Sequence, residues 1–424
     1  MLKKSLRIAI ATGLYAPFLT GVSIAVHQRV RWFLQQGHEV FLIHPQINNQ
    51  YPANVGKRPM QGLEELQQYP NFSNYAFPTK PLIFYKSLPQ PLNYRHWNDT
   101  QLLEDFQPDV VLVEEAAQIR GIYSLFLQGY GRPIAVEYGK KTSTPIISIF
   151  HTDIVAYIQY YLGNQLFSLI RPFIPKIIKQ FSLSYDLSLF CSKGQLAKYQ
   201  ELECQRSEYL PYQGVNCKKF NPENIVYNPI PDDNRPTLLF VGRITAEKNV
   251  TQLLDIYPLI ADKIKDVHLV IIGSGPAQEI INQRAKKFSS GVTVWGESHG
   301  KELLGWFARA DLFVNPSVTE NFCTTNQEAL ASGTPVVGAI APSTAEQVIS
   351  GSNGFLAEPN NPEDFANKII QILENPQLKD QMSRNARSYI HEFDWSTCME
   401  KLESRLYQIV QTSKKELNLA PLER

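Results

Sequence analysis

Two series of short apolar runs, each run followed by a helical stretch, constrain the fold of this 424-residue chain more than any other feature. Runs that are apolar throughout are typical of parallel strands covered by helices on both faces. The boundaries of the runs are clearer in the C-terminal half. There the sequence predicts strands at 237–242, 268–273, 292–296, 312–315 and 335–339 and helices at 248–261, 277–288, 300–309, 323–332 and 362–373. It therefore predicts a doubly wound α/β unit that binds ligands at the carboxyl ends of its strands.

The N-terminal half predicts a second α/β unit. Its expected strands are 6–11, 39–44, 109–113, 146–150 and 187–191, with a helix at 23–36. We expect 48–96, which is rich in Pro, Asn and Tyr, to be irregular, the proline-rich 221–236 to be a linker, and 376–412 to be helical. The chain length also favours two domains, because single cores rarely exceed about 250–300 residues.

The formal net charge of +1 argues against a nucleic-acid partner, but it hides an asymmetry. Residues 1–220 contain 22 Lys and Arg against 15 Asp and Glu, a net charge of +7. Residues 221–424 contain 19 against 25, a net charge of −6. The basic half predicts that the first domain faces an anionic partner.

Five cysteines without a CxxC pair predict neither a disulfide framework nor a zinc site, and they favour a reducing, cytosolic compartment. The apolar run within 1–11 is too short for a signal peptide. The uncharged stretch 154–170 contains too many polar residues for a spanning helix. We therefore expect a protein that stays on the cytoplasmic side of a membrane and does not cross it.

Two cations follow the first strand of the second unit. Arg243 comes directly after Gly242, and Lys248 lies five residues further on, at the start of the next expected helix. A guanidinium and an ammonium beside a helix N-terminus form a strong anion site, and two cations suit a diphosphate. The alternative is ordinary surface charge on a strand-to-helix loop.

A second cluster lies at 320–328. Glu320 is expected in a loop after a strand, and Glu328 about one turn inside the following helix. The free backbone N–H groups near 323–325 can bind a phosphate, while each carboxylate holds sugar hydroxyls. The alternative is a helix with a favourable acidic first turn.

Other ligand motifs are incomplete or missing. The sequence 273–275 resembles the start of a GxGxxG, but position 278 is Gln, and the motif follows the second strand of its unit. No GxxxxGK[ST] occurs, which argues against a P-loop kinase. No Asp-x-Asp and no HExxH occur, so the usual carboxylate pair for a metal-bound sugar nucleotide is missing.

Two positions in the first half also follow strands. Gly21 lies between the first strand and helix, where a glycine lets the backbone approach a phosphate; a plain helix cap at Ser23 is the alternative. His151 follows the strand 146–150 at its carboxyl end. It is either a ligand-contacting or a structural histidine.

Together, Gly21, His151, the Arg243–Lys248 element, the Glu-x7-Glu at 320 and 328, and the sequence at 329–337 (ALASGTPVV) resemble the retaining, metal-independent glycosyltransferases of family 4. The resemblance covers nearly the whole chain. It implies the GT-B fold of two facing Rossmann-like domains, at 1–220 plus 396–424 and at 221–395. The last helix crosses back to the first domain in this fold.

The resemblance implies a nucleotide-sugar donor held mainly by the second domain and an acceptor held by the first. Its implied catalytic residues are His151, Arg243, Lys248 and Glu320, and its implied donor-binding residues are Gly21, Trp295, Cys323, Thr324, Thr325 and Glu328. The two cations neutralise the donor diphosphate, Glu328 holds the ribose, Trp295 lies near the base, and His151 contacts the sugar. No cofactor and no metal are implied.

Within the family, the sequence 323–330 (CTTNQEAL) is similar to the variant found in digalactosyldiacylglycerol synthases, because Asn321 and Cys323 replace the two glycines of the common Glu-Gly-Phe-Gly. The sequences 113–115 and 149–157 are similar as well. This resemblance implies galactose transfer from UDP-galactose to monogalactosyldiacylglycerol in a thylakoid or plasma membrane. The alternatives are a mannosyl- or glucosyltransferase for another lipid or polysaccharide, and a catalytically silent sugar-nucleotide-binding module.

The segment 154–181 combines aromatic and aliphatic residues with Arg171, Lys176 and Lys179. In a basic domain, such a mixture suits a surface that lies on anionic lipid. The alternative is that part of the segment is buried in the core of the first domain.

Overall fold

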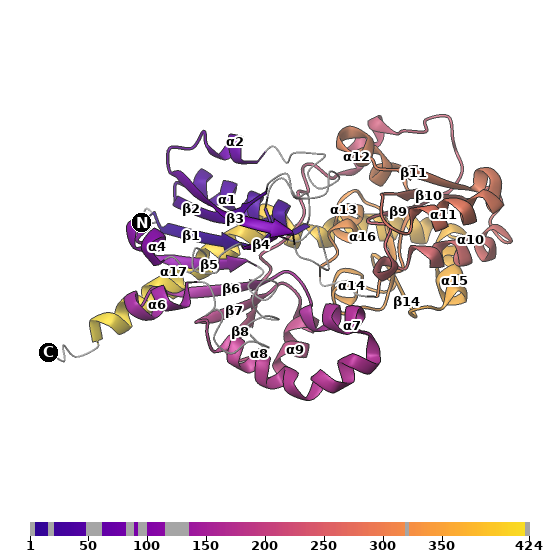
Figure 1. Ribbon diagram of the computed structural model, residues 1–424. Helices are drawn as coiled ribbons and strands as arrows, with labels where there is room; N and C mark the ends of the chain where they lie inside the picture. The colour runs from indigo at the N-terminus through magenta and orange to yellow at the C-terminus, as the bar shows by residue number, and fades with distance from the viewer. Residues whose placement is uncertain are drawn as a thin grey trace. The chain divides into compact units, whose positions relative to one another are not determined.

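The computed structural model describes residues 5–15, 21–47, 62–81, 89–91, 100–114, 135–318 and 322–419. Contacts between residues divide the chain into two compact units, and each contains its own sheet (Figure 1). Unit 1 comprises Met1–Cys191, Gln195–Tyr212 and Met399–Arg424. Unit 2 comprises Ser192–Gly194 and Gln213–Cys398.

The sheet of unit 1 has the order β4-β3-β2-β1-β5-β6-β7-β8. All neighbouring strands are parallel except β3 and β4, which are antiparallel. The strands are β1 (Arg7–Thr12), β2 (Glu39–Gln46), β3 (Phe72–Pro81), β4 (Pro89–Pro91), β5 (Val110–Glu114), β6 (Ile146–Phe150), β7 (Leu187–Phe190) and β8 (Ser207–Tyr209). Strands β1, β5 and β6 are buried almost throughout, as their apolar sequences predict.

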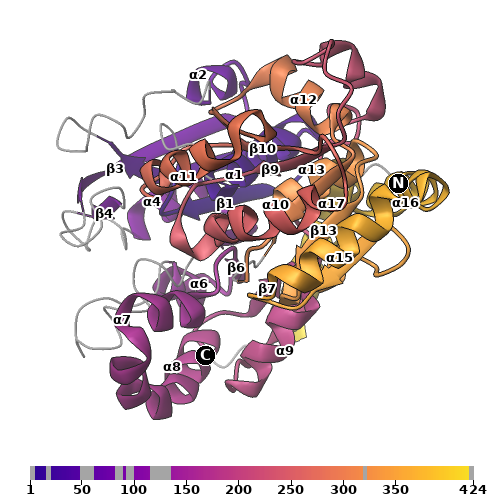
Figure 2. The same ribbon diagram turned by 90° about the vertical axis from the view of Figure 1, so that its right-hand side faces the viewer.

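The helices of unit 1 connect these strands. They are α1 (Gly21–Gln35), α2 (Leu63–Leu66), α4 (Thr100–Phe106), α6 (Val136–Thr142), α7 (Ile154–Ile170), η1 (Arg171–Phe173), α8 (Ile174–Ser182) and α9 (Lys193–Glu201). Gly163 interrupts α7 with a φ of +70°, a conformation that glycine adopts without strain. Figures 1 and 2 show α7 and α8 at the opposite end of the unit from α2.

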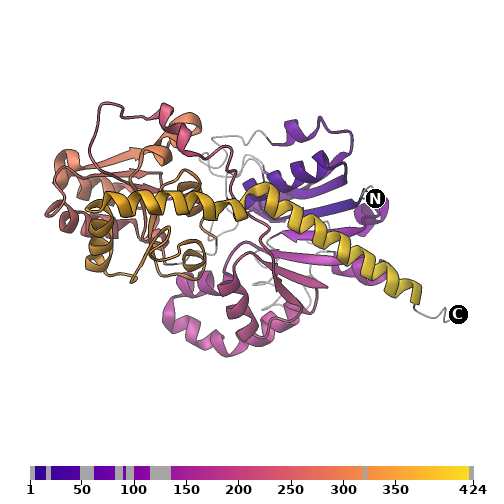
Figure 3. The same ribbon diagram turned by 180° about the vertical axis from the view of Figure 1, so that it is seen from behind.

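The last helix, α17 (Trp395–Leu419), carries the chain from unit 2 back to unit 1. Figure 3 shows it running along the strands of unit 1. The Trp32 indole N–H donates to Glu403 at 3.4 Å, and the Arg405 guanidinium forms two 2.8 Å hydrogen bonds with the Glu208 carboxylate. The expected return of the last helix to the first domain is confirmed.

The sheet of unit 2 is parallel, with the order β11-β10-β9-β12-β13-β14. Its strands are β9 (Thr237–Val241), β10 (His268–Ile272), β11 (Val292–Gly296), β12 (Leu312–Asn315), β13 (Val336–Ala339) and β14 (Gly354–Ala357). Its helical segments are η2 (Pro222–Tyr227), η3 (Ala246–Lys248), η4 (Val250–Gln252), α10 (Leu253–Ala261), α11 (Gln278–Ala285), η5 (Lys286–Gly291), α12 (Gly300–Arg309), α13 (Thr324–Ala331), α14 (Pro342–Gln347), α15 (Pro362–Leu373), α16 (Pro376–Ile390) and η6 (His391–Phe393).

Successive residues of each strand in unit 2 enter two different cores, because side chains alternate between the faces of a sheet. Leu238 and Phe240 pack with α10, α11 and α15 on one face. Leu239 packs with α12, α13 and α16 on the other. The prediction of a doubly wound sheet is confirmed.

Three local predictions are wrong. Residues 62–81 are not irregular, because they form α2 and β3, while the rest of 48–96 apart from β4 lies outside the described residues. The proline-rich 221–236 is not a free linker, because η2 within it packs against α12. The predicted helix 248–261 begins as 3₁₀ turns, and its α-helical part starts only at Leu253.

Candidate functional site

The order of strands in unit 2 reverses between β9 and β12, which are hydrogen-bonded neighbours. In doubly wound sheets, the crevice at such a reversal, at the carboxyl ends of the strands, is the usual place for a ligand. The loops after the two strands also meet, since the Ser317 hydroxyl lies 3.4 Å from the Glu247 carbonyl oxygen. The structure therefore brings the predicted diphosphate residues and the start of α13 to the same edge of the sheet.

Arg243 lies directly beyond β9, and its side chain is 54% exposed. Its Nη2 lies 3.4 Å from Glu247 Oε1, so the guanidinium is partly neutralised but remains accessible. Lys248 is half-buried and ends the 3₁₀ turn η3, five residues before α10 begins. The cations thus flank a short 3₁₀ turn rather than a helix N-terminus, which corrects the expected local geometry.

The start of α13 follows β12. Cys323 precedes the first helical residue, and its side chain makes no capping hydrogen bond. It is instead buried, with its Sγ 3.2 Å from Asn315 Nδ2 and 3.3 Å from Thr325 Oγ1. The Asn315 amide also donates to Asn326 Oδ1 at 3.0 Å, so buried hydrogen bonds anchor the first turn of α13 to the end of β12. The N–H groups of Thr324 and Thr325 belong to that anchored first turn.

Glu328 lies one turn into α13 and is half-buried. Burial raises the pKa of its carboxyl to about 7, and the nearby charge of Lys219 opposes the shift. Its ionisation therefore changes around neutral pH. The other predicted carboxylate, Glu320, lies outside the described residues.

The glycines after β10 have a packing role. Gly273 has a φ of +140°, and a Cβ at this position would lie 1.8 Å from the Gly242 carbonyl oxygen. Only glycine fits this approach between the loops after β9 and β10. Trp295, near the end of β11, is partly exposed and packs edge-on against the buried Trp306, with ring centroids 4.9 Å apart.

In unit 1, His151 follows β6, and its side chain is only 2% exposed. Its Nε2 lies 2.6 Å from Glu114 Oε2, and the other oxygen of Glu114 pairs with Arg29 Nη1. The sequence analysis did not predict the pair between Arg29 on α1 and Glu114 at the end of β5. Gly21 begins α1 and is exposed, so Ser23 lies inside the first turn and does not cap the helix.

The predicted membrane residues lie on η1 and α8, and all three are exposed. Lys179 Nζ pairs with Glu203 at 2.7 Å, which offsets its charge. Among the described residues, neither Arg171 nor Lys176 has an ion-pair partner. Phe167 and Phe181 are buried in the core, as the alternative interpretation of this segment predicts.

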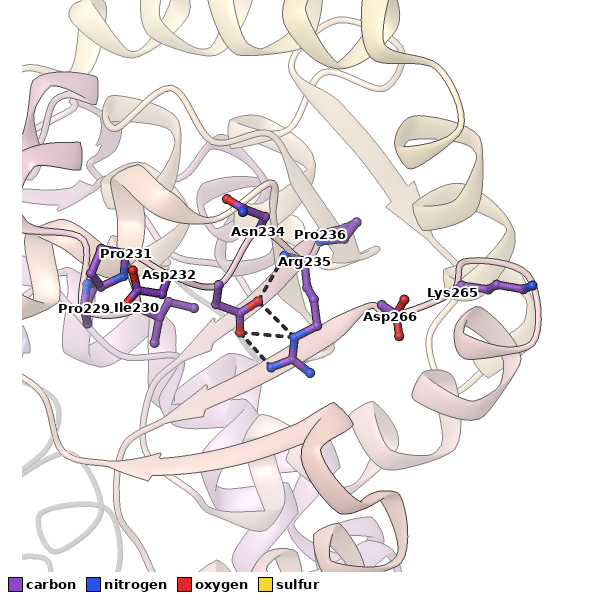
Figure 4. Close-up of a pocket in the computed structure, with 10 residues that line it drawn as sticks. Pro229, Ile230, Pro231, Asp232, Asn234, Arg235, Pro236, Lys265 and Asp266 are labelled. Atoms are coloured by element: carbon purple, nitrogen blue, oxygen red, sulfur yellow. Dashed lines mark hydrogen bonds and ion pairs between the residues drawn. The ribbon is translucent and has the colours of Figure 1, made fainter.

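A pocket of about 850 Å³ lies elsewhere in unit 2 (Figure 4). Residues 229–236, together with Lys265 and Asp266, line it. These residues precede β9 and β10, so the pocket lies at the amino ends of the strands. It is separate from the candidate site at the carboxyl ends. Within its lining, Arg235 donates from Nε to Asp233 Oδ1 at 3.0 Å and from Nη2 to Asp233 Oδ2 at 2.7 Å.

The chain is similar to known glycosyltransferases. Residues 223–389 match the family of glycosyl transferases group 1. The sulfoquinovosyl transferase SQD2 of Arabidopsis thaliana is 28% identical over 284 residues, which are 64% of this chain and 54% of that protein. The alpha-monoglucosyldiacylglycerol synthase of Acholeplasma laidlawii is 21% identical over 429 residues, 97% of this chain and 100% of that protein. The chain spans about half the length of the first curated relatives that it matches.

A crystal structure of Anabaena Alr3699/HepE in complex with UDP superposes with a TM-score of 0.70 at 15% identity, over 95% of this chain and 99% of that one. At this identity the likeness concerns the fold. The two parallel-sheet α/β units have the GT-B fold, as expected, and the match to the group 1 glycosyl transferases falls within unit 2. Among the described residues, no helix is both long and apolar enough to span a bilayer.

Proposed function

We propose that this protein is a retaining glycosyltransferase that transfers a hexose from a nucleotide sugar to a membrane glycolipid. We further propose galactose from UDP-galactose as the donated group and monogalactosyldiacylglycerol as the acceptor. The observation that carries the proposal is the contact between the Arg243–Lys248 loop and Ser317, in the loop after β12, at the reversal of strand order. The end of the same strand, at Asn315, anchors the start of α13. Cations and helical N–H groups at one sheet edge suit a diphosphate.

The comparisons support the class of donor and acceptor. One structural neighbour was crystallised with UDP, and one relative is named for the synthesis of a glucosyldiacylglycerol. The choice of galactose rests on the resemblance of the sequence around Cys323. A glucosyltransferase for a diacylglycerol lipid is the second candidate, because the relative with that name aligns along almost the whole chain.

In the proposed mechanism, the acceptor hydroxyl attacks the anomeric carbon on the face that the diphosphate leaves. The acceptor oxygen forms the new glycosidic bond, the bond from the anomeric carbon to the diphosphate oxygen breaks, and that phosphate takes the acceptor proton. Arg243 and Lys248 stabilise the negative charge that develops on the leaving group. The sequence offers no carboxylate as an evident nucleophile on the opposite face, so we propose no covalent intermediate.

The deciding experiment incubates the protein with radiolabelled UDP-galactose, UDP-glucose and GDP-mannose, each with vesicles of defined membrane lipids. We expect labelled lipid from UDP-galactose and monogalactosyldiacylglycerol, with the anomeric configuration of the donor retained in the product by NMR. Labelled product from UDP-glucose and diacylglycerol alone would support the second candidate. Inversion at the anomeric carbon would contradict the mechanism.

We predict that the transfer needs no divalent metal, since Arg243 and Lys248 take the place that a cation occupies on the diphosphate in metal-dependent enzymes. The measurement is the transfer rate after exhaustive dialysis and in excess chelator. We expect a rate within about twofold of the untreated protein. Complete loss that magnesium or manganese restores would contradict this prediction.

We also propose that α7, η1 and α8 lie on an anionic membrane surface. Leu169 and Phe173 are 67% and 62% exposed, and Leu166 is 48% exposed in the same segment. Exposed apolar side chains that are grouped together are typical of a surface that binds a membrane or a partner. Arg171 and Lys176 are exposed beside them. Exposed apolar side chains can enter the interface of a bilayer, while the cations bind lipid phosphates.

The membrane proposal predicts that Arg171→Gln together with Lys176→Gln weakens sedimentation with anionic vesicles, by up to about 1 kcal/mol per charge. Lys179→Gln is the matched control, and we expect a smaller effect because Glu203 already offsets this charge. Salt should release the wild-type protein, since exposed charges are screened within about 8–10 Å. Equal binding to neutral and anionic vesicles would contradict the proposal.

A further inference from the structure

A chain of buried side-chain amides runs through unit 2 from the end of β12 to the end of α14. Asn315 ends β12, Asn326 lies in the first turn of α13, and Gln347 ends α14. Their exposed fractions are 2%, 0% and 3%. Polar groups that are buried this deeply are costly unless they are hydrogen-bonded, so the contacts of these amides determine what they contribute.

A backbone N–H group fixes the orientation of all three amides. The N–H of Ser317 donates to Asn315 Oδ1 at 3.1 Å, so Nδ2 of Asn315 is the atom that faces α13. It donates to Asn326 Oδ1 at 3.0 Å, and Asn326 Nδ2 in turn donates to Gln347 Oε1 at 3.1 Å. Turning any one amide would place two donors or two acceptors against each other, so each amide has one favourable orientation.

Asn315 connects the two halves of the candidate donor site. On one side it accepts from Ser317, whose hydroxyl lies 3.4 Å from the Glu247 carbonyl oxygen in the loop of the two cations. On the other side its Nδ2 also lies 3.2 Å from the Sγ of Cys323, the residue before α13. One buried side chain thus links the Arg243–Lys248 loop to the start of α13.

The other end of the chain of amides is fixed by backbone contacts. Asn353, whose side chain is 0% exposed, accepts from the Ile349 N–H at 2.7 Å and donates to the Gln347 carbonyl oxygen at 3.0 Å. Asn326 is therefore held between two anchored neighbours. Because α13 has only eight residues, packing and side-chain links of this kind determine where its first turn lies.

We propose that Asn315 and Asn326 are positioning residues of the donor site, because they hold the first turn of α13 beside the Arg243–Lys248 loop. The N–H groups of Thr324 and Thr325 and the two cations then converge on one diphosphate. Both amides act without touching the nucleotide, since they are buried, whereas the two threonines are only half-buried. The diphosphate rests on the proposed function, but the anchoring of α13 does not depend on it.

The first test measures the affinities of the full-length protein for UDP and for uridine in Asn326→Leu, by calorimetry. Leucine has a similar volume but forms neither hydrogen bond, so the first turn of α13 loses its side-chain links to β12 and α14. We expect the affinity for UDP to fall about 10-fold and the affinity for uridine, which has no diphosphate, to change less than about twofold. Equal losses for UDP and uridine, or no loss for UDP, would overturn the inference.

A double variant separates positioning from stability. Asn326→Leu alone leaves buried polar atoms of Asn315 and Gln347 without their partners, so it should unfold at lower urea concentration than the wild type. Asn326→Leu with Gln347→Leu replaces both partners of one hydrogen bond by apolar groups, which is nearly neutral for stability. We expect the double variant to recover stability but not the affinity for UDP. Recovery of both together would overturn the positioning role.

Asn224→Leu is the matched control. Asn224 lies on η2, is 8% exposed and donates to the Lys219 carbonyl oxygen at 2.8 Å, so it is another buried asparagine of unit 2 outside the chain of amides. Its replacement should leave the ratio of the UDP affinity to the uridine affinity unchanged. A fall in this ratio as large as in Asn326→Leu would contradict a specific role of Asn326.

Hydrogen exchange tests the anchoring without any ligand. In Asn326→Leu, the amides of 323–331 should exchange faster than in the wild type, because local opening of α13 becomes less costly. The amides of α15 should exchange at the wild-type rate. An unchanged rate in 323–331 would overturn the inference.

The outcomes separate the inference from the proposed function. Wild-type protein that binds UDP more tightly than uridine but transfers no sugar would contradict the proposed function alone. Transfer by the wild type, together with an unchanged ratio of UDP to uridine affinity in Asn326→Leu, would overturn the inference alone. Equal affinity of the wild type for UDP and uridine would overturn both, because the diphosphate would then contribute nothing to binding.

Discussion

Arg243→Ala and Lys248→Ala should each lower the rate of sugar transfer by about 10²–10³-fold, the usual effect of removing one group that stabilises transition-state charge. Both residues belong to the loop after β9, and the Arg243 guanidinium is accessible to a ligand. The charge on the leaving diphosphate grows as its bond to the sugar breaks. The loss should therefore appear mainly in kcat, measured as radiolabelled lipid formed at saturating donor.

Two further variants make this test specific. Arg243→Lys keeps the charge but loses the planar, bidentate fork, and we expect it to recover only part of the rate. Arg284→Ala is the matched control in unit 2. Arg284 lies on α11 and pairs with Asp255 on α10 at 2.6 Å, so its loss should leave transfer unchanged. If Arg243→Ala or Lys248→Ala kept more than about half of the wild-type rate in folded protein, the diphosphate assignment would be wrong.

The sequence predicts all the central strands of unit 2, and it also predicts β11 at one edge of the sheet. β9, β10, β12 and β13 are buried on both faces, so their sequences are continuous apolar runs. β3 escapes prediction because it lies between β2 and the short β4 near one edge of its sheet. Most of its side chains stay partly exposed, and it therefore contains Asn, Thr, Lys and Pro.

The sequence predicts those residues of the candidate site that lie close together along the chain. Arg243 and Lys248 lie five residues apart beside a strand end, so the sequence alone groups them. Arg29 and Glu114 are 85 residues apart, and only the packing of α1 on the sheet brings them together. The pair between Lys179 and Glu203 also joins residues that are far apart along the chain. The sequence around Lys179 predicts an exposed cation for lipid, but the fold brings Glu203 beside it.

Glu328→Gln should lower the affinity for the nucleotide and raise the stability of the protein above pH 7. We propose that the Glu328 carboxylate accepts hydrogen bonds from the ribose of the donor. Hydrogen bonds to a carboxylate contribute about 1.5–3 kcal/mol, so their loss should weaken UDP binding about 10- to 100-fold by calorimetry. In wild type, affinity should rise between pH 6 and pH 8, as the carboxyl with a pKa of about 7 ionises. In Glu328→Gln this rise should be absent.

The effect on stability has the opposite sign. The pKa of the Glu328 carboxyl is about 4.5 in the unfolded chain and about 7 in the folded protein, so the wild type loses stability as pH rises from about 4.5 through 7. Glutamine cannot ionise and avoids this loss. Because the side chain is only half-buried, we expect a gain of about 1–3 kcal/mol in the free energy of unfolding at pH 8, by urea titration, and little gain at pH 4.5.

The two opposite signs distinguish a ligand-binding carboxylate from a structural one. If the Glu328 carboxyl only supports α13, Glu328→Gln should lower the free energy of unfolding. Its affinity for UDP should then change no more than that of a surface control. Glu279→Gln on α11 provides that control, since its carboxylate bonds only to Gln283 in the part of the chain that the structure describes. If Glu328 is a ligand-binding carboxylate, Glu328→Gln should weaken UDP binding and also stabilise the protein at pH 8. Both effects have one cause, because the substitution removes the charge that is costly to bury and that we propose binds the ribose.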